Sequence, residues 1–474
     1  NTDDGNCNKI DNSTFTGSTI DIPPNSNIEI TEDITLNNVN EYLNLTGDNI
    51  TIDGKGYTIT VTVADYPGFI KNGTDDGKTD PAPCKKVTIK NINVDGTNGS
   101  LASGGGWIAQ EYFGEYINGG NILFKNCSST GPISTNSGGI SGRDTGGKMT
   151  NSTITFNNCY STNTIGQYAG GISAVGTGSL MDNSTITFNK CYSTGAIIDV
   201  SGGGISATGI GYKMKNSSTI TFENCYSTGT IKGKAGGISG ENTGKEMNES
   251  TIIFNNCYSK GDIENNAGGI SGYGTGSQMT NGSSISANNC YSTGTIATNA
   301  GGISGGYTGY KMNSSTITVI NCYTNGVFES INAGGIYGKH KGAEMTNGST
   351  ITDSNCITSA LASQTAGVWN DTNAAITIGT STANNDVTDV WHNPDASSSW
   401  IHRSSGQTDI IDGCTDSNAF NYDSTANTDD GNCIDKVFGC TDSNAFNYDN
   451  TANTDDGTCV DKVYGCNDNS YVEY

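Results

Sequence analysis

The chain has 474 residues, of which 33% are hydrophobic and 66 are glycine, and its formal net charge is −24 at pH 7. This apolar content is too low for a compact globule with a thick core, but the apolar residues recur too regularly for a disordered chain. The acidic balance, with 23 Lys and Arg in all, argues against a nucleic-acid partner, because phosphate binding needs a basic surface. No run of about 18 apolar residues occurs, so membrane insertion is not expected.

Residues 1–11 start at Asn1 rather than at Met, and we interpret the chain as a processed product or a segment of a longer protein. Residues 12–126 follow, with short stretches of alternating apolar and polar residues at 49–59 and 87–94. Alternation of this period is typical of half-buried strands. We predict that residues 12–126 form irregular N-terminal coils of a β-solenoid.

Residues 127–356 repeat a unit of 32 to 34 residues, one copy of which starts at Ser218 and reads STITFENCYSTGTIKGKAGGISGENTGKEMNE. One Cys, the Ile of a Gly-Gly-Ile step and one Met keep the same register from copy to copy. This register predicts parallel stacking, with columns of Ile, Phe and Met inside. We interpret the Met column as gap-filling core rather than as a soft-metal site. The repeated residues are Cys127, Cys159, Cys191, Cys225, Cys257, Cys290, Cys322 and Cys356, and Met149, Met181, Met214, Met247, Met279, Met312 and Met345.

The cysteines of the repeat are predicted to point inward. Strict alternation from Phe156 would turn Asn158 inward and Cys159 outward. Yet the residue equivalent to Asn158 in the next copy is Lys190, which does not suit a thin core. A bend at the Asn pair would instead bury Cys159 as a free thiol and leave the following tyrosine outside. Disulfides between neighbouring cysteines stay open as an alternative. The outer tyrosines would be Tyr160, Tyr192, Tyr226, Tyr258, Tyr291 and Tyr323.

Fourteen Asn-x-Ser/Thr sequons occur, and seven of them fall once per repeat, one or two residues after the Met. This phase predicts a line of acceptors for N-linked glycans along one edge, about 4.8 Å apart if each repeat is one coil. The prediction applies to a eukaryotic or viral host and has no force in a cell without that machinery. The predicted acceptors are Asn12, Asn44, Asn49, Asn72, Asn98, Asn126, Asn151, Asn183, Asn216, Asn248, Asn281, Asn313, Asn347 and Asn370.

Residues 357–412 lose the repeat and contain Trp369, Trp391 and Trp400. Large apolar side chains suit a cap over the open last coil, and we interpret this segment as a cap and linker. An aromatic sugar-binding surface stays open as the alternative.

Residues 413–438 and 439–464 are two copies of a second, acidic repeat. A segment this short cannot build a core without cross-links, so each copy is expected to contain a disulfide. Carboxylates are hard oxygen ligands, so the modules predict either calcium sites or solvated acidic loops. The predicted cross-links are Cys414–Cys433 and Cys440–Cys459, and the candidate calcium ligands are Asp416, Asp423, Asp429, Asp430, Asp442, Asp449, Asp455 and Asp456.

The two ends of the chain carry complementary parts of this module: residues 465–474 match its first part and residues 1–11 its last part. One interpretation is that neighbouring copies complete each other's module, joined by an intermolecular disulfide between Cys466 and Cys7. A second is that the chain is one period of a tandem polyprotein cut within a module, and a third is an arbitrary boundary. The first two predict a head-to-tail homopolymer, which propagates as a filament.

The repeat sequences resemble known families. The Cys-Tyr-Ser-Thr-Gly and Gly-Gly-Ile-Ser-Gly steps resemble the GLUG-type repeats of surface adhesins, and residues 49–59 and 87–94 resemble the first coils of pectate-lyase-like β-helices. Over residues 28–356 these resemblances imply an all-β, right-handed parallel β-helix, and they specify fold better than activity. The acidic modules resemble a tandem module near the C-termini of surface proteins of aquatic microbes and large algal viruses.

No catalytic motif is visible. The acidic residues of the repeats do not share a column, Arg occurs only at Arg143 and Arg403, and no partner is evident for any of the three histidines, including His340. We therefore predict no enzyme but a structural subunit of an extracellular glycosylated fibre, secreted or on a cell or virion surface, since frequent cysteines suit an oxidising compartment. The alternative is a cell-surface adhesin or carbohydrate-binding β-helix spike.

Overall fold

The structure, a computed structural model, describes residues 7–73, 83–329 and 333–358, and short segments beyond them. These segments are 375–378, 382–383, 391–392, 401–402, 412–413, 416–422, 424, 428–429, 433–443, 445–449 and 451–460. The chain divides into two compact units, residues 1–386 and 387–474, which we describe separately. Within the described part of the chain, no helix has the length and apolar character needed to cross a membrane.

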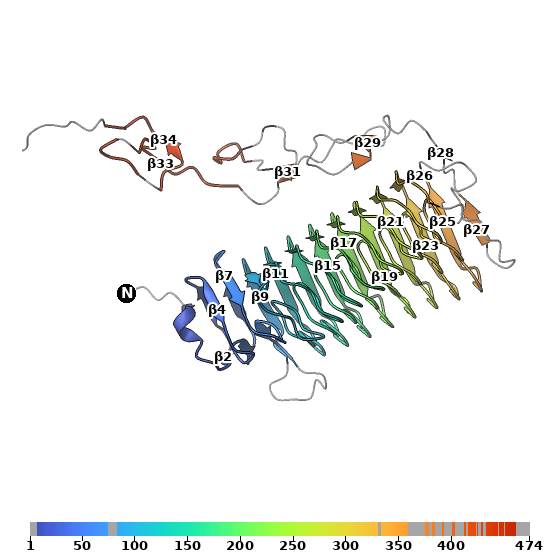
Figure 1. Ribbon diagram of the computed structural model, residues 1–474, viewed down its shortest axis with the longest axis horizontal. Helices are drawn as coiled ribbons and strands as arrows, with labels where there is room; N and C mark the ends of the chain where they lie inside the picture. The colour runs from blue at the N-terminus through green and yellow to red at the C-terminus, as the bar shows by residue number, and fades with distance from the viewer. Residues whose placement is uncertain are drawn as a thin grey trace, which may run out of the picture. The chain divides into compact units, whose positions relative to one another are not determined.

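The first unit is a parallel β-solenoid whose coils stack in chain order (Figure 1), which confirms the predicted all-β fold. Its strands form three parallel sheets of 13, 12 and 3 strands. The 13-stranded sheet contains β1 (Cys7–Ile10), β3 (Asn27–Ile30), β6 (Ile50–Asp53), β9 (Lys86–Lys90), β11 (Asn121–Lys125), β13 (Thr153–Asn157), β15 (Thr185–Asn189), β17 (Thr219–Glu223), β19 (Thr251–Asn255), β21 (Ser284–Asn288), β23 (Thr316–Ile320), β25 (Thr350–Ser354) and β27 (Ala375–Ile378).

The second and third sheets are built from shorter strands. The 12-stranded sheet contains β4 (Ile34–Leu36), β7 (Thr58–Val61), β10 (Asn93–Asp95), β12 (Ser128–Ser129), β14 (Tyr160–Ser161), β16 (Tyr192–Ser193), β18 (Tyr226–Ser227), β20 (Tyr258–Ser259), β22 (Tyr291–Ser292), β24 (Tyr323–Thr324), β26 (Ile357–Thr358) and β28 (Thr382–Ala383). The 3-stranded sheet contains β2 (Ile20–Ile22), β5 (Leu43–Leu45) and β8 (Ile70–Lys71).

Each sequence repeat forms one coil. In the pairing of β13 with β15, Thr153 lies opposite Thr185 and Phe156 opposite Phe188, so equivalent residues of successive copies are direct neighbours. The same register continues through the regular part of the solenoid, and it converts each repeated residue into a column of identical side chains.

The long strands bury alternate residues, and a bend then reverses the alternation. Ile154 and Phe156 are fully buried, while Thr153 and Thr155 face outward. Asn158 then adopts a left-handed backbone with φ of 54°, which asparagine tolerates better than most residues. This turn directs Cys159 into the core, as the sequence predicted.

The third side of each regular coil holds the Gly-Gly-Ile step, where successive coils meet at isolated parallel bridges such as Gly138 with Gly170. Backbones approach closely there. A Cβ atom on Gly139 would lie 2.0 Å from the carbonyl oxygen of Gly171, so no larger residue fits without a shift of the backbone.

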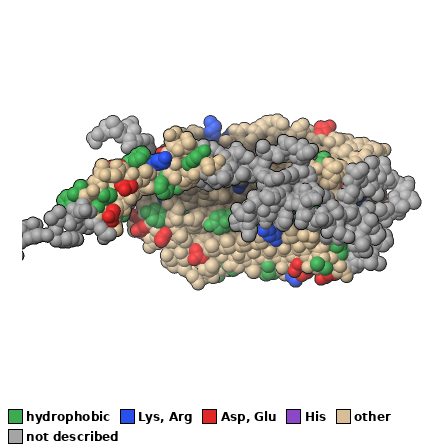
Figure 2. All heavy atoms as spheres, turned by 90° about the horizontal axis from the view of Figure 1, so that it is seen from above, with side chains coloured by type: hydrophobic (Ala, Val, Ile, Leu, Met, Phe, Trp, Pro, Cys, Tyr) green, Lys and Arg blue, Asp and Glu red, His purple; other side chains and the backbone are tan. Residues whose placement is uncertain are grey.

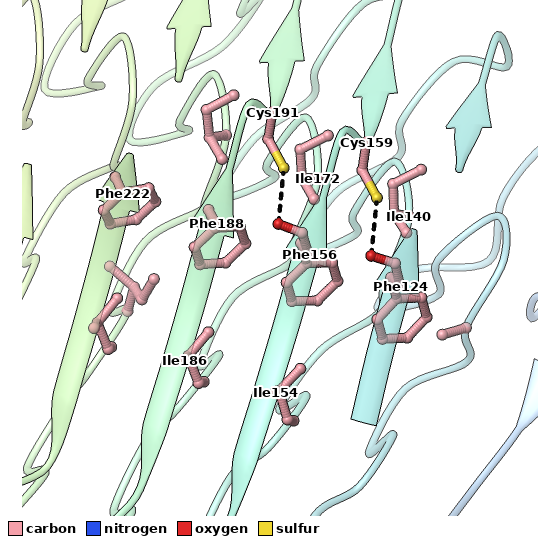
Figure 3. Close-up of a cluster of buried hydrophobic side chains, with 14 of the residues drawn as sticks. Phe124, Ile140, Ile154, Phe156, Cys159, Ile172, Ile186, Phe188, Cys191 and Phe222 are labelled. Carbon is pink, nitrogen blue, oxygen red and sulfur yellow. Dashed lines mark hydrogen bonds between the residues drawn. The ribbon is translucent and has the colours of Figure 1, made fainter. Parts of the chain in front are cut away.

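The core is a narrow column of stacked apolar side chains. The rings of Phe124 and Phe156 lie 4.8 Å apart and within 5° of parallel, and the stack continues to Phe188 and Phe222 (Figure 3). All seven methionines are buried beside this stack, which confirms the interpretation of the Met column as core. Near the N-terminal end, Phe15 follows the 3-10 helix η1 (Asn12–Thr14) and its ring lies 6.0 Å from that of Phe69.

The second unit contains short strand pairs. β29 (Trp391–His392) pairs antiparallel with β30 (Ile401–His402), and two parallel pairs follow in the acidic modules. The parallel pairs are β31 (Asp412–Gly413) with β32 (Thr428–Asp429) and β33 (Phe438–Gly439) with β34 (Thr454–Asp455). Trp369 and Trp400 lie outside the described residues, so the cap stays a prediction.

Candidate functional site: side-chain ladders along the solenoid

Eight cysteines form a single file inside the solenoid, behind the bend that follows each long strand. The Sγ of Cys159 donates a hydrogen bond to the carbonyl oxygen of Phe124 in the preceding coil (3.8 Å), and Cys191 bonds in the same way to Phe156 (3.4 Å; Figure 3). All eight are buried free thiols, as is Cys84, so the alternative of disulfides along the column is not realised. Burial is the largest effect on the pKa of each thiol from Cys127 to Cys322, and it opposes loss of the proton.

The predicted tyrosine ladder exists, but only part of it is open to solvent. Tyr160 and Tyr192 stack with ring centroids 4.8 Å apart, and both are half-buried. The ladder continues to Tyr291, which is 1% exposed, and Tyr323 beyond it is 3% exposed. Burial raises the pKa of Tyr192 to about 12. The expectation of an outer ladder therefore holds for its first part only.

The repeated sequon asparagines form a hydrogen-bonded ladder of their own. The Nδ2 of Asn183 donates to the Oδ1 of Asn151 (2.7 Å), and Asn281 donates to Asn248 in the same way (2.8 Å). Asn216 donates instead to the carboxylate of Asp182 (2.8 Å). The seven acceptors of the regular repeats thus share one edge, as predicted, but most of their amides are already engaged with neighbouring coils.

The remaining sequons lie in different environments. Asn98 is exposed, whereas Asn72 is only 1% exposed and forms two hydrogen bonds with the backbone of Cys84. The Nδ2 of Asn72 donates to the carbonyl oxygen of Cys84 (3.1 Å), and the backbone amide of Cys84 donates to the Oδ1 of Asn72 (2.6 Å). A glycan on Asn72 does not fit this packing. The predicted acceptor Asn370 lies outside the described residues.

A six-residue turn occurs in eight coils and carries most of the sequence variation; in seven of them it lies between the Gly-Gly-Ile step and the Met, and in the first it ends before Ile117. Its third residue is usually a buried Thr that bonds to backbone, such as Thr145 to the carbonyl of Gly142 (2.7 Å). Its fourth residue is always Gly with positive φ, as in Gly146 (63°). The first, second and sixth residues vary and are at least partly exposed in most coils, whereas the fifth is buried in half of them. The turns span residues 111–116, 143–148, 175–180, 208–213, 241–246, 273–278, 306–311 and 339–344.

Charged and aromatic side chains gather on these turns. Arg143 lies over the ring of Tyr112 (5.1 Å to the centroid), bonds to its hydroxyl, and pairs with Glu111 (3.1 Å). The ring of His340 lies 4.6 Å from that of Tyr307. The sequence analysis named no partner for His340, although Tyr307 holds the same turn position in the preceding copy and the repeat register places the two side by side.

One buried ion pair was not predicted. Lys341 and Asp353 are 4% and 5% exposed at their side chains, and Nζ lies 3.6 Å from Oδ1. Lys341 replaces the buried Thr of the turn, and Asp353 replaces the column residue that is Val319 in the coil before. Burial lowers the pKa of Lys341, and the nearby carboxylate of Asp353 opposes this effect. The sequence could have pointed to this pair, because Lys341 and Asp353 both depart from the residue types that the repeat has at their positions.

The acidic modules show the predicted cross-link where it is described. Cys440 and Cys459 form a disulfide, and Cys433 is also disulfide-bonded, while Cys414 lies outside the described residues. The predicted intermolecular pair of Cys7 and Cys466 lies where no side chain is described.

The candidate calcium ligands are only partly described. The carboxylates of Asp449 and Asp456 each accept hydrogen bonds from a threonine two residues later, at Thr451 and Thr458. These bonds lower the pKa of both carboxyls. Among the described residues, no three His, Cys, Asp or Glu side chains form a metal-binding group. Asp423 and Asp430 lie outside that part of the chain, and calcium binding stays a prediction.

Comparisons with models of protein families, with curated proteins and with solved structures find no match for this chain. The geometry defines a parallel β-solenoid whose repeated residues form columns of side chains inside and ladders of side chains along its surface.

Proposed function

We propose that this chain is a structural subunit of an extracellular fibre. The observation that carries the proposal is the uninterrupted ladder of the 13-stranded sheet, in which the inner strands are hydrogen-bonded on both sides. Such a ladder resists local opening, because separating one coil breaks backbone bonds and stacked ring contacts along its whole length. Stacked Phe rings 4.8 to 4.9 Å apart, from Phe124 to Phe254, add side-chain contacts along that part of the solenoid.

The surface supports the same proposal. On the face seen in Figure 2, charged side chains are scattered among uncharged polar ones rather than gathered into one large patch. A rod with this surface stays hydrated and resists side-by-side aggregation. The resemblance of the repeats and modules to surface proteins supports an extracellular place, as do the disulfides of the acidic modules.

The test is electron microscopy of the full chain combined with disulfide mapping on unreduced material. Filaments whose axial repeat matches the solenoid support the proposal, and a linked peptide of Cys466 with Cys7 would establish a covalent head-to-tail joint. Monodisperse single rods at all protein concentrations would contradict the fibre and favour the adhesin interpretation.

A further inference from the structure

Four aromatic side chains on neighbouring six-residue turns form one cluster, which we call the aromatic platform: Tyr273, Tyr307, Tyr310 and His340. The ring of Tyr307 lies at its centre, with centroids 5.1 Å from Tyr273 and 4.6 Å from His340. Tyr310 meets Tyr307 edge-on at 5.7 Å. The four side chains come from three successive coils and are half-buried, so part of each residue remains accessible.

The fold does not require these rings. Tyr307 and His340 occupy the second residue of the turn, where the backbone is left-handed, with φ of 57° and 63°. The conformation is set by pairing between coils, since the amide of Tyr307 donates to the carbonyl of Lys339 in the next coil (2.8 Å). Five of the six equivalent residues in other coils are of types that favour such a backbone, namely Gly176, Gly209, Gly274, Asn242 and Asp144, and the sixth is Tyr112, with φ of 62°.

Bulky aromatic residues at positive φ are strained, and strained residues concentrate at functional sites. The backbone of neighbouring coils does not impose glycine at this position. A Cβ on Gly209 would meet no atom within 4 Å, and on Gly176 and Gly274 the nearest atoms would be side-chain oxygens of Asp144 (2.1 Å) and Asn242 (2.9 Å). The backbone alone therefore disfavours Tyr307 and His340. Their occurrence in two successive coils, with rings in contact, points to a role outside folding.

The rim of the platform is polar and balanced in charge. Lys311 pairs with Glu344 (3.3 Å), which also accepts a hydrogen bond from the Tyr310 hydroxyl (3.0 Å). At the other side, Lys234 lies 5.1 Å from the ring centre of Tyr273 and 3.7 Å from a carboxylate oxygen of Glu241. Each of these cations has an anion beside it, so the rim offers hydrogen-bond donors and acceptors without a net charge of one sign.

We propose that the aromatic platform binds a neutral carbohydrate chain. The C–H faces of sugar rings pack on aromatic faces, and sugar hydroxyls bond to paired carboxylates and ammonium groups at the rim. An anionic ligand would be repelled by the net negative charge of the chain. A cationic ligand would compete with Lys234 and Lys311 for the carboxylates of Glu241 and Glu344. The proposal is independent of whether the chain forms a fibre.

The test is native gel electrophoresis of the full chain in gels that contain mannan, xylan or laminarin as neutral polysaccharides, and alginate as an anionic one. We expect retardation by at least one neutral polysaccharide and none by alginate. The variants Tyr307→Gly and His340→Gly should each weaken binding about tenfold. Glycine is the residue of three other coils at this position, so both variants should fold and keep or raise the unfolding temperature.

Tyr112→Gly is the matched control, because it makes the same substitution at the same turn position, five coils before the turn of Tyr273. It should leave the retardation unchanged. Absence of retardation by every neutral polysaccharide, retardation by alginate alone, or full binding by a folded Tyr307→Gly variant would each overturn the proposal.

Discussion

The side-chain amide of Asn183 donates a hydrogen bond to the side-chain oxygen of Asn151, one coil away, over 2.7 Å. Both residues are predicted glycan acceptors, and the donating Nδ2 is the atom to which a glycan would be attached. The ladder that places the acceptors in line therefore also makes neighbouring acceptors compete, because one coil separates them by about 4.8 Å.

Glycosylation of the ladder is accordingly expected to be mutually exclusive between neighbours. In a eukaryotic secretory host, single molecules should carry a glycan on Asn151 or on Asn183 but rarely on both, and Asn183→Gln should raise the occupancy of Asn151. Glycopeptide mapping with a protease that leaves both residues on one peptide measures this directly. Asn98, exposed and outside the ladder, is the control and should be fully occupied. Full joint occupancy of Asn151 and Asn183 would contradict the prediction.

Asn72 is expected to act as a structural residue rather than as an acceptor. Its side chain satisfies both backbone groups of Cys84, so Asn72→Ala leaves a buried N–H and C=O unpaired. We expect a loss of about 2 kcal/mol in the free energy of unfolding, measured by urea titration. The control Asn98→Ala changes an exposed residue and should stay within about 0.5 kcal/mol of the parent. Equal stability of the two variants would refute the structural role.

Much of the fold could be predicted because the repeat shows which residues are equivalent in successive coils. The shared register of Cys159 with Cys191, and of one Met with the next, fixes the columns before any coordinates are known. The site could be predicted only in part. The contact of Tyr307 with His340 was open to prediction, because both hold the same turn position in successive copies. The pairing of Asn72 with Cys84 was not, because it joins two residues of the irregular coils, where no periodicity relates them.

The buried pair of Lys341 and Asp353 predicts that replacing one partner lowers the free energy of unfolding, whereas replacing both does not. Asp353→Val alone leaves a buried ammonium without its partner and should lower the free energy of unfolding by about 3–5 kcal/mol. The double variant with Lys341→Thr restores the residues found at these positions in the coil before, Thr308 and Val319, and should be as stable as the parent or more so. Urea titration of the three proteins decides the matter: a double variant no more stable than the single one would show that the pair is not coupled.

The thiol column predicts that the solenoid loses stability in alkali. An unfolded cysteine loses its proton near pH 8.5, about the reference value, whereas in the folded chain burial is the largest effect on the pKa of each thiol from Cys127 to Cys322 and opposes loss of the proton. Above that pH the folded state therefore binds more protons, and the free energy of unfolding falls as pH rises. We expect a lower urea midpoint at pH 9.5 than at pH 7.5, and a smaller difference in the variant Cys191→Ala. Identical midpoints at the two pH values would contradict the burial of the column.

Reduction of disulfides should destabilise the acidic modules and leave the stability of the solenoid unchanged. The link between Cys440 and Cys459 closes a loop with a sequence separation of 19, and such a cross-link contributes about 3 kcal/mol to a segment with almost no core. Cys440→Ser, or treatment with dithiothreitol, should therefore open residues 439–460 to limited proteolysis. The solenoid should keep its unfolding temperature under the same treatment, because its described cysteines are free thiols and form no disulfide to lose. Proteolysis followed by mass spectrometry, with a thermal melt of the same samples, measures both. A solenoid that melts at a lower temperature in reductant would mean that a disulfide outside the described residues supports it.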